Sequence, residues 1–326
     1  MSTELAQPAH APLPWHTHAW QRFNQALAVQ RSAHALLLAG PTGLGKRALA
    51  QAMAARVLCD RPSNDLACGQ CRGCQLRLAG SHPDYTVIEP EAGGSGILKI
   101  EAVRQLTTFS QRTSQYDGYR VAVLAPAEAM NRHTANALLK TLEEPPASVM
   151  LILVSHRPAL LAATIRSRCQ ILTLNPPQQS QSLEWLTAQG IEQPALALML
   201  AGGAPLAAQA IAEAGGTQQF AELINGVAAV AGGRASAVAV ASEWQAIGAR
   251  ETTELMQRLT LLLARYQALS SSSPGLPASI EPLARATAPK RLQSIAEKLY
   301  QLRAATSQSL SRELSVEALF LLWTRA

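Results

Sequence analysis

Short apolar runs alternate with helix-forming stretches along the first half of the chain. The apolar runs lie at residues 35–40, 85–90, 119–126, 149–155 and 170–177. The run VMLILVS at 149–155 is almost continuously apolar, as expected for a strand that is covered on both faces. The intervening stretches at 46–58, 97–114 and 135–146 have helical character, and the last of them repeats apolar residues at i, i+3, i+4 and i+7. Strands alternating with helices predict a parallel α/β sheet with right-handed crossovers.

The pattern changes at Pro176 and Pro177, beyond which the sequence predicts helices and no strand. Short helices are expected around residues 182–189, 194–201 and 205–214. Helices resume from Phe220 to the end of the chain, with a loop at 270–277. We therefore predict three domains: an α/β domain over 1–176 with an insertion at 59–74, a small helical domain over 177–215, and a larger helical domain over 216–326.

Composition supports helices and excludes two classes of segment. Hydrophobic residues make up 48% of the chain and aromatic residues 4%, and the abundance of alanine and leucine favours helix. The first fifteen residues lack the basic start and apolar stretch of a secretory signal. The most apolar segment, 194–212, is interrupted by Gly202, Gly203 and Pro205, whereas a spanning helix needs about 20 mostly apolar residues. We expect two helices joined by a turn there, no membrane partner and a cytoplasmic location.

The net charge of +6 is unevenly distributed. Residues 1–175 contain 17 lysines and arginines against 11 acidic residues, whereas residues 176–326 contain 11 of each kind. A basic first half is compatible with nucleic acid nearby. An ordinary basic surface explains so mild an excess equally well.

The stretch GPTGLGKR at residues 40–47 matches the phosphate-binding loop Gly-x-x-x-x-Gly-Lys-Ser/Thr in all but its last letter. Backbone N–H groups of such a loop point at phosphate oxygens, and the following helix adds positive potential. The candidate phosphate ligands are Gly40, Gly43, Gly45 and Lys46. Arg47 stands where a hydroxyl would hold Mg²⁺, and a guanidinium has no acceptor atom for a metal.

A second requirement for nucleotide hydrolysis is also missing. A working P-loop enzyme needs an aspartate at the end of a strand to hold the metal, and in this class an adjacent glutamate as base. The strand expected at 119–126 ends instead in Ala125 and Pro126, and the nearest acidic residue is Glu128. The loss of both elements predicts that the chain does not hydrolyse ATP.

Four of the five cysteines lie close together, at the spacing C-x₈-C-x₂-C-x₂-C. They are Cys59, Cys68, Cys71 and Cys74. A cytosolic chain seldom uses such a cluster for disulfides, so a metal is the better interpretation. Four thiolates complete a tetrahedral zinc site with no open position, which predicts a structural zinc; an iron–sulfur cluster is the less favoured alternative. Cys169 lies apart and is expected to be a packed thiol.

The sequence Ser167-Arg168-Cys169 comes directly before the last predicted strand. An arginine in this position could reach the γ-phosphate of a neighbouring subunit and stabilise the charge of the transition state. From the residues alone, an ordinary surface arginine is the more common role.

Taken together, these motifs resemble those of the delta-prime subunits of bacterial DNA polymerase III clamp loaders. The resemblance covers nearly the whole chain and is strongest over 14–177. The segments that carry it are PW (14–15), HALLLAGPTGLGK (34–46), CGQCRGCQL (68–76), GSHPDY (80–85), ANALLKTLEEPP (135–146) and RSRCQ (166–170).

The resemblance implies an AAA+ architecture: a RecA-like P-loop domain, a three-helix lid and a C-terminal helical collar that holds five subunits together. It implies that Arg168 is an arginine finger acting in trans and that the four clustered cysteines hold zinc. Leu206 stands where an active relative carries a sensor arginine. The family role is that of a stator without ATPase activity of its own, inside a DNA polymerase holoenzyme. Whether the loop still binds ATP stays open.

The resemblance also names partners: the delta and gamma/tau subunits in a hetero-pentamer, with the sliding clamp and primed DNA reached through the complex. Two alternatives come from other classes. An active gamma/tau-like AAA+ motor would need the acidic strand end and the Ser/Thr that are missing here. A zinc-bearing nucleic-acid-binding module would need basic and aromatic residues around the cysteines, yet 59–74 contains two arginines, two aspartates and no aromatic residue.

Overall fold

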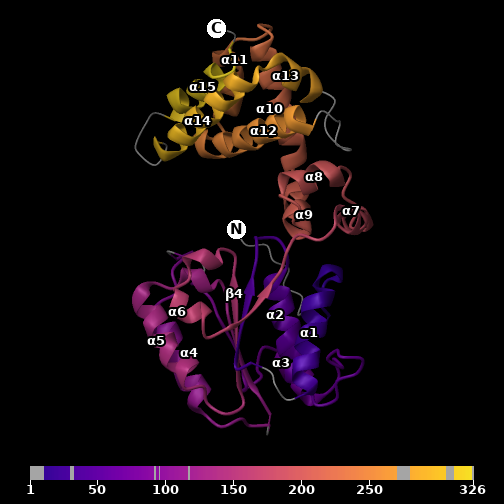
Figure 1. Ribbon diagram of the computed structural model, residues 1–326, viewed down its shortest axis with the longest axis vertical. Coiled ribbons are helices and arrows are strands. Elements are labelled where there is room, and N and C mark those ends of the chain that lie inside the picture. Colours follow the sequence, from indigo (N-terminus) through magenta and orange to yellow (C-terminus); the bar gives the residue numbers. More distant parts are fainter. Residues whose placement is uncertain are drawn as a thin grey trace. The chain divides into compact units, whose positions relative to one another are not determined.

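The computed structural model describes residues 11–29, 33–91, 93–94, 96–116, 118–269, 280–305 and 312–324. The chain forms two compact units (Figure 1). Unit 1 comprises residues 1–181 together with 204–207, and unit 2 comprises residues 182–203 and 208–326. The loop predicted at 270–277 lies outside the described residues.

Unit 1 is built on a five-stranded parallel sheet. In spatial order its strands are β2 (Tyr85–Ile88), β3 (Arg120–Leu124), β4 (Val149–Ser155), β1 (Ala35–Ala39) and β5 (Gln170–Thr173). All seven residues of β4 are buried, as its continuous apolar sequence predicted. The parallel α/β sheet expected from the sequence is therefore confirmed, and the phosphate loop follows β1, which lies between β4 and β5.

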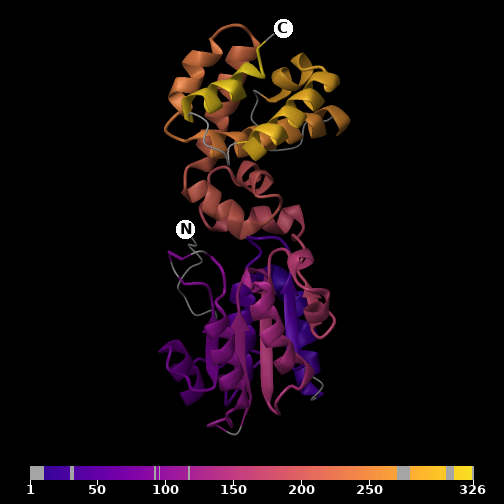
Figure 2. The same cartoon turned by 90° about the vertical axis from the view of Figure 1, so that its left-hand side faces the viewer.

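Helices cover both faces of this sheet (Figures 1 and 2). The helices on one face are α1 (Thr17–Ala28) and α2 (Lys46–Val57), and those on the other are α4 (Ile100–Gln111), α5 (Arg132–Glu143) and α6 (Ala163–Arg166). Successive side chains of β1 point to opposite faces: Leu36 and Leu38 pack with the first group, and Leu37 packs with the second. Each face thus has its own apolar core.

Some elements of unit 1 were missed or misplaced at the sequence level. Helix α5 begins at Arg132, earlier than the predicted 135, because the Asn131 side chain caps it by accepting a 2.9 Å hydrogen bond from the Thr134 N–H. Helices α1 and α3 (Arg72–Leu78) and the 3₁₀ turn η1 (Pro14–His16) were not predicted. The i, i+3, i+7 spacing of Trp20, Phe23 and Leu27 in α1 was the overlooked signal.

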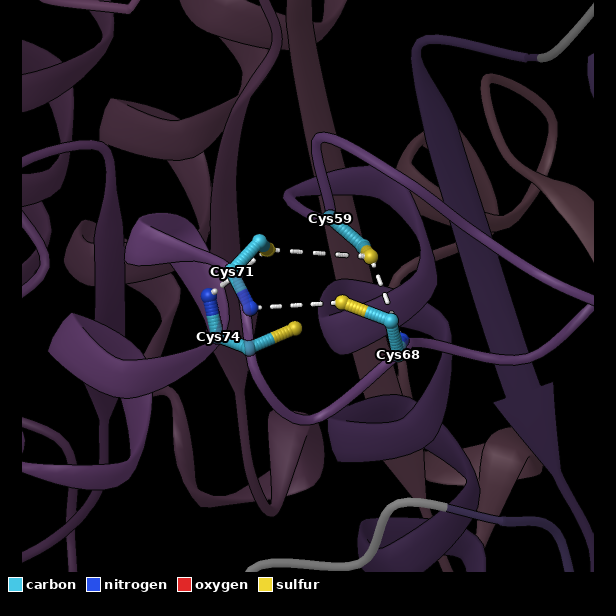
Figure 3. Close-up of side chains that lie close together, drawn as sticks. All are labelled: Cys59, Cys68, Cys71 and Cys74. Carbon is cyan, nitrogen blue, oxygen red and sulfur yellow. Dashed lines mark hydrogen bonds between the residues drawn. The ribbon is translucent and has the colours of Figure 1, made fainter.

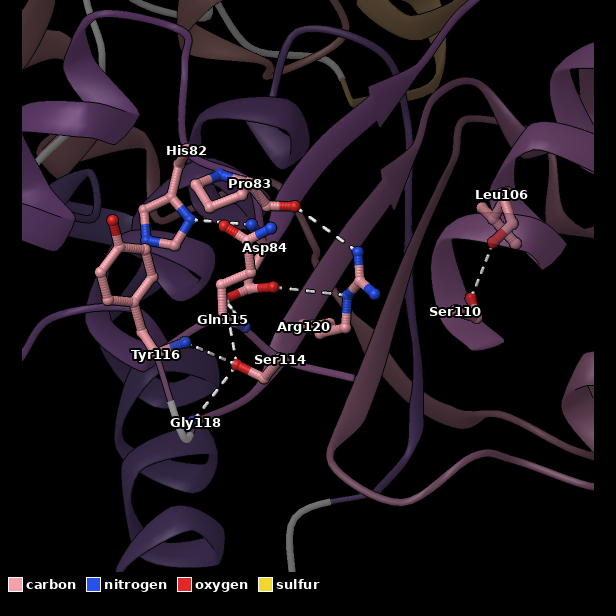
Figure 4. A network of polar contacts seen from close by, with 10 residues as sticks. All are labelled: His82, Pro83, Asp84, Leu106, Ser110, Ser114, Gln115, Tyr116, Gly118 and Arg120. Atoms are coloured by element: carbon pink, nitrogen blue, oxygen red, sulfur yellow. Dashed lines mark hydrogen bonds and ion pairs between the residues drawn. The ribbon is translucent and has the colours of Figure 1, made fainter. Parts of the chain in front are cut away.

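A buried ion pair joins the start of β2 to β3 (Figure 4). The Arg120 guanidinium lies 3.5 Å from the Asp84 carboxylate, and both side chains are at most 4% exposed. The same guanidinium stacks 4.1 Å from the ring centre of Phe109. The second carboxylate oxygen of Asp84 accepts hydrogen bonds of 3.0 Å from the Ser114 hydroxyl and the Gln115 N–H. This network fixes the loop that leads from α4 into β3.

Unit 2 is helical throughout its described residues. Its helices are α7 (Gln179–Ala188), α8 (Pro194–Leu200), α9 (Pro205–Glu213), α10 (Gly216–Ala231), α11 (Ala237–Trp244), α12 (Ala249–Leu269), α13 (Ile280–Ala286), α14 (Pro289–Ala305) and α15 (Arg312–Leu321). The first residues of α7 (179–181) and of α9 (205–207) belong to unit 1. A small core forms around Leu186 and Leu198, and a larger one around Phe220 and Phe320. Since α8 contributes to both cores, the boundary predicted at 215/216 stays a prediction.

The apolar segment 194–212 forms two helices, as predicted. Among the described residues, none of the helices taken singly has the length and apolar character of a membrane span. Helices α8 and α9 reach that threshold as a pair, but they are bent by 111° at the break between them.

Candidate functional site

The phosphate loop follows the carboxyl end of β1 and leads into α2, so the predicted strand–loop–helix context is present. Gly43 and Gly45 have φ angles of 81° and 75°, in the left-handed region that glycine adopts without strain. In an open parallel sheet, ligands bind at this carboxyl edge.

The outer side of the loop is covered by apolar residues of unit 1. The Leu206 N–H donates a 3.1 Å hydrogen bond to the Gly43 carbonyl. A side chain added at Gly43 would collide with Ala207, and one added at Gly45 would meet Leu13 at 2.5 Å and Leu206 at 3.1 Å. The chain therefore lies against its own phosphate cradle, which the sequence did not reveal.

Both basic residues of the motif interact with other groups of the chain. Lys46 is 1% exposed, and its ammonium group donates a hydrogen bond to the Pro41 carbonyl within the same loop. Arg47 forms a 2.9 Å ion pair with Glu89, which follows β2. The sequence predicted that Arg47 could not hold a metal, but it did not show that the guanidinium is matched by a carboxylate 42 residues away.

Residues 13–16, which precede α1, anchor the phosphate loop through hydrogen bonds to Leu44. The Leu44 carbonyl accepts hydrogen bonds from the Trp15 indole N–H (2.9 Å) and from Nε2 of His16 (2.7 Å). Because the Leu13 N–H donates to Nδ1 of His16 at 3.2 Å, the imidazole is neutral with its proton on Nε2. Burial lowers the pKa of His16 to about 4, and the positive charge of Lys46 acts in the same direction.

We predict that acid weakens unit 1 through His16. The folded pKa of about 4 lies below the ordinary 6.5, so the unfolded chain binds the proton first and the contribution is lost as the pH falls from 6.5 towards 4. At about 1.4 kcal/mol per pKa unit the loss is about 3 kcal/mol. Urea unfolding at several pH values should show a shallower acid decline in His16→Gln than in the parent, whereas the exposed His18→Gln should keep the parental slope. Equal slopes in all three proteins would contradict the prediction.

Glu128, the acidic residue that follows the strand end at Ala125 and Pro126, is hydrogen-bonded to the backbone. Oε1 of Glu128 accepts hydrogen bonds from the N–H groups of His156 (2.9 Å) and Arg157 (3.2 Å), which follow β4. Burial alone would raise the pKa of Glu128, but main-chain hydrogen bonds outweigh burial and lower it. A groove of about 540 Å³ lies beside this carboxylate and reaches Thr42 of the phosphate loop. Glu128 thus braces the ends of two strands.

Arg168 lies at the opposite edge of the sheet from the phosphate loop. It comes just before β5, and Gln170, the first residue of β5, pairs with Leu36 near the amino end of β1. The phosphate loop follows the carboxyl end of that same strand. The arginine therefore lies at the far edge of the sheet from the chain's own phosphate cradle.

The side chain of Arg168 is held at the surface by weak contacts. It forms a 2.8 Å ion pair with Glu143 at the end of α5, with 36% of the arginine and 48% of the glutamate side chain exposed. It also donates a 3.1 Å hydrogen bond to the Thr164 carbonyl. An ion pair this exposed contributes at most about 1 kcal/mol, so Arg168 can exchange Glu143 for a stronger anionic partner. The sequence did not identify Glu143.

The four clustered cysteines converge on one point (Figure 3). Their sulfur atoms all lie within 4.8 Å of one another, and those of Cys59 and Cys71 are 3.8 Å apart. Sulfur atoms at about 2.3 Å from a tetrahedral zinc are themselves about 3.8 Å apart. The arrangement therefore fits a four-thiolate metal site for an ion such as zinc.

The local backbone is adapted to this arrangement. The N–H groups of Cys68, Cys71 and Cys74 donate to the sulfurs of Cys59, Cys68 and Cys71, respectively, at 3.2–3.4 Å. Main-chain hydrogen bonds lower the pKa of Cys68 to about 6, whereas burial raises the pKa of Cys59. A side chain at Gly73 would collide with the Leu58 carbonyl, so this glycine allows α3 to approach Cys59.

The cysteine segment is fastened to the sheet through His82 (Figure 4). Nδ1 of His82 accepts a 3.1 Å hydrogen bond from the N–H of Asp84, the residue that pairs with Arg120. The His82 ring lies 5.6 Å from that of Tyr116, over which Arg72 of α3 stacks at 5.4 Å. These contacts join the cysteine cluster to the sheet of unit 1.

Comparison with known proteins identifies the family. The family model described as "DNA polymerase III, delta subunit" matches residues 15–178. The "DNA polymerase III subunit delta'" of Pseudomonas aeruginosa is 38% identical over 321 residues, covering 95% of this chain and 96% of that protein. The chain belongs to the delta' subunits of DNA polymerase III. The delta' subunit of Escherichia coli is 34% identical over 317 residues, 94% of each chain.

As a delta' subunit the chain is part of the DNA polymerase III clamp loader, and its partners are other subunits of that assembly. The family resemblance drawn from the motifs is thereby confirmed. Among solved structures, a gamma subunit-related protein of Thermotoga maritima matches with a TM-score of 0.47 at 16% identity, covering 92% of this chain and 98% of that one.

Proposed function

We propose that this delta' chain is a non-hydrolysing stator of the clamp loader that supplies Arg168 to the ATP site of a neighbouring motor subunit. The observation that carries the proposal is the placement of Arg168 at the sheet edge opposite to the chain's own phosphate loop. An arginine at that edge is not placed to contact a nucleotide bound in its own loop. The Arg168 side chain is exposed and weakly held, by a surface ion pair. An arginine that contacts another subunit needs both properties.

The phosphate loop supports the same role. The cradle is covered by Leu13, Leu206 and Ala207, and its lysine is buried against the loop itself. The Mg²⁺ ligand is replaced by Arg47, which is paired with Glu89. We infer that ATP neither binds to nor is hydrolysed by this subunit. The loop instead serves as a packing surface, anchored through Leu44 by His16.

The four-cysteine cluster is proposed to hold a structural zinc ion. Zinc would supply four bonds that tie Cys59, at the end of α2, to the turn and helix formed by 68–78. Four protein ligands leave no position for a substrate, so the site contributes to folding and not to a reaction.

The finer partners and steps are part of the proposal. The subunit would sit in a cytoplasmic hetero-pentamer with delta and gamma/tau, through the helices that follow 216. ATP bound by a motor subunit would be contacted by Arg168, and the assembled ring would open the sliding clamp and place it on primed DNA. Hydrolysis at the motor site, accelerated by Arg168, would then release the clamp.

We predict that the isolated chain has no ATPase activity and binds no ATP. Turnover with ATP and Mg²⁺ should stay far below the roughly 1 s⁻¹ at the low end of ordinary enzymes, and equilibrium dialysis should retain no nucleotide. The double variant Leu13→Ala, Leu206→Ala shortens two side chains that face Gly45 and is the matched test of whether the covering residues exclude nucleotide. Micromolar ATP binding by the parent would contradict the inference that the covered loop excludes nucleotide, and ATP turnover would contradict the stator proposal.

A further inference from the structure

Arg77 is a buried arginine that has no carboxylate partner in the part of the chain that the structure describes. It lies on α3 with 6% of its surface exposed. Its Nε and Nη2 atoms are buried and have no hydrogen-bond partner among the described residues, and no ion pair joins it to an acidic side chain there. Burying a charge is costly unless an opposite charge lies nearby. The position therefore calls for a negative group that these contacts do not supply.

Three groups interact with Arg77 electrostatically: Tyr85, His82 and Cys74, the last of which belongs to the cluster. Burial lowers the pKa of Arg77, and Tyr85 and Cys74 oppose this effect. Burial also raises the pKa of Tyr85 above its usual value, so its hydroxyl is uncharged at neutral pH. Cys74 precedes Arg77 by three residues on α3, and residues three apart share one face of a helix. Both are among the buried residues of this helix.

We propose that Arg77 is the counter-charge of the four-cysteine metal centre. This inference rests on the proposed zinc site. A zinc ion with four thiolates has a net charge of −2, and the cluster offers those four sulfurs within 4.8 Å of one another. A guanidinium one helical turn from Cys74 offsets part of that charge, and the centre in turn makes the burial of Arg77 favourable. Arg77 is thus a positioning residue that tunes the metal site without binding the metal.

Replacing Arg77 should weaken zinc binding. Changes to groups that support metal ligands commonly lower metal affinity 10- to 100-fold, and we expect a loss in that range for Arg77→Met, which keeps the apolar part of the side chain. Arg77→Lys keeps the charge and should recover most of the affinity. Arg104→Met removes an exposed charge from α4, outside the cysteine segment, and should leave the affinity unchanged. The measurement is competition for zinc against a chromophoric chelator.

Thermal unfolding gives a second readout in which the effect should reverse. With zinc bound, Arg77→Met should lower the unfolding midpoint, because a favourable charge pair is lost. In excess chelator the four-thiolate dianion does not exist, so the same substitution removes an uncompensated buried charge. The midpoint should then stay unchanged or rise. A role in packing alone would lower the midpoint equally with and without zinc.

The outcomes separate the two ideas. Purified parent protein should contain one zinc ion per chain, and absence of metal would overturn the zinc site together with the role of Arg77. Zinc in the parent with unaltered affinity in Arg77→Met would overturn the role of Arg77 and leave the zinc site standing. Equal losses in Arg77→Met and Arg77→Lys would show that charge is not the cause. If Arg77→Met folds poorly, thiolate-to-metal absorption of the cobalt-loaded Arg77→Lys and parent proteins provides the comparison.

Discussion

Replacing Arg168 by alanine is expected to reduce ATP turnover at the neighbouring motor site by about 10³-fold, the low end of the range for arginine fingers. In the assembled clamp loader, total ATPase should fall by at least that site's share, and clamp loading on primed DNA should slow. Single-turnover hydrolysis by the reconstituted complex is the measurement. Undiminished ATPase and loading in the Arg168→Ala complex would contradict the finger role.

The large expected loss of rate follows from the contact of the Arg168 guanidinium with the transition state. The small expected loss of stability follows from its few contacts within the chain. Arg168 offers a planar set of donors to the charge that develops on the transferred phosphoryl group. Its contacts within the chain are a surface ion pair with Glu143 and a hydrogen bond to Thr164, so its loss should cost the isolated subunit at most about 1 kcal/mol. A large kinetic effect with an intact fold is thus expected.

Three matched variants isolate this effect. Arg168→Lys keeps the charge but loses the two-pronged geometry, and it should recover little activity. Glu143→Gln releases Arg168 from its ion pair and should leave turnover at the motor site at least as fast as in the parent. Arg157→Ala removes an exposed arginine at the carboxyl edge of the sheet and should change nothing. Gel filtration of each complex distinguishes lost assembly from lost catalysis.

Replacing Cys74 by serine is the second prediction with a large expected effect. The variant should lose its bound zinc, measured by elemental analysis after dialysis. Structural zinc sites bind with apparent free energies of about 10–16 kcal/mol in small domains, and this energy couples to folding. Because Cys74 is 1% exposed and holds α3 to the rest of the cluster, several kcal/mol of local stability should disappear, and protease should cut 59–81 first.

The fifth cysteine is the matched control for this experiment. Cys169 lies outside the cluster and packs as a partly buried thiol beside the sheet, and burial raises its pKa to about 11. Cys169→Ser should therefore retain a full complement of zinc and normal resistance to protease. Zinc content in Cys74→Ser equal to that in Cys169→Ser would rule out the four-cysteine site.

Most of the fold could be read from local patterns. The strands from β1 to β5 and the helices of the second half were predicted because apolar periodicity is a property of neighbouring residues. Helix α3 was missed because its seven residues have few periodic apolar positions, and because Cys71 and Cys74 were interpreted only as metal ligands and not as the N-cap and a buried position of a helix. The start of α5 was misplaced because the cap at Asn131 was overlooked.

By itself the sequence determined the elements, the spacing of the four cysteines, the loss of the Mg²⁺ ligand at Arg47 and the candidate finger Arg168. Each of these features depends on residues that are close together in the sequence. Only the tertiary structure decided that Leu206 covers the phosphate loop, that Glu89 pairs with Arg47 and that Arg168 lies at the sheet edge opposite to its own loop. These features join residues far apart in the chain, and such contacts are selected by the packing of the whole unit, which no local pattern encodes.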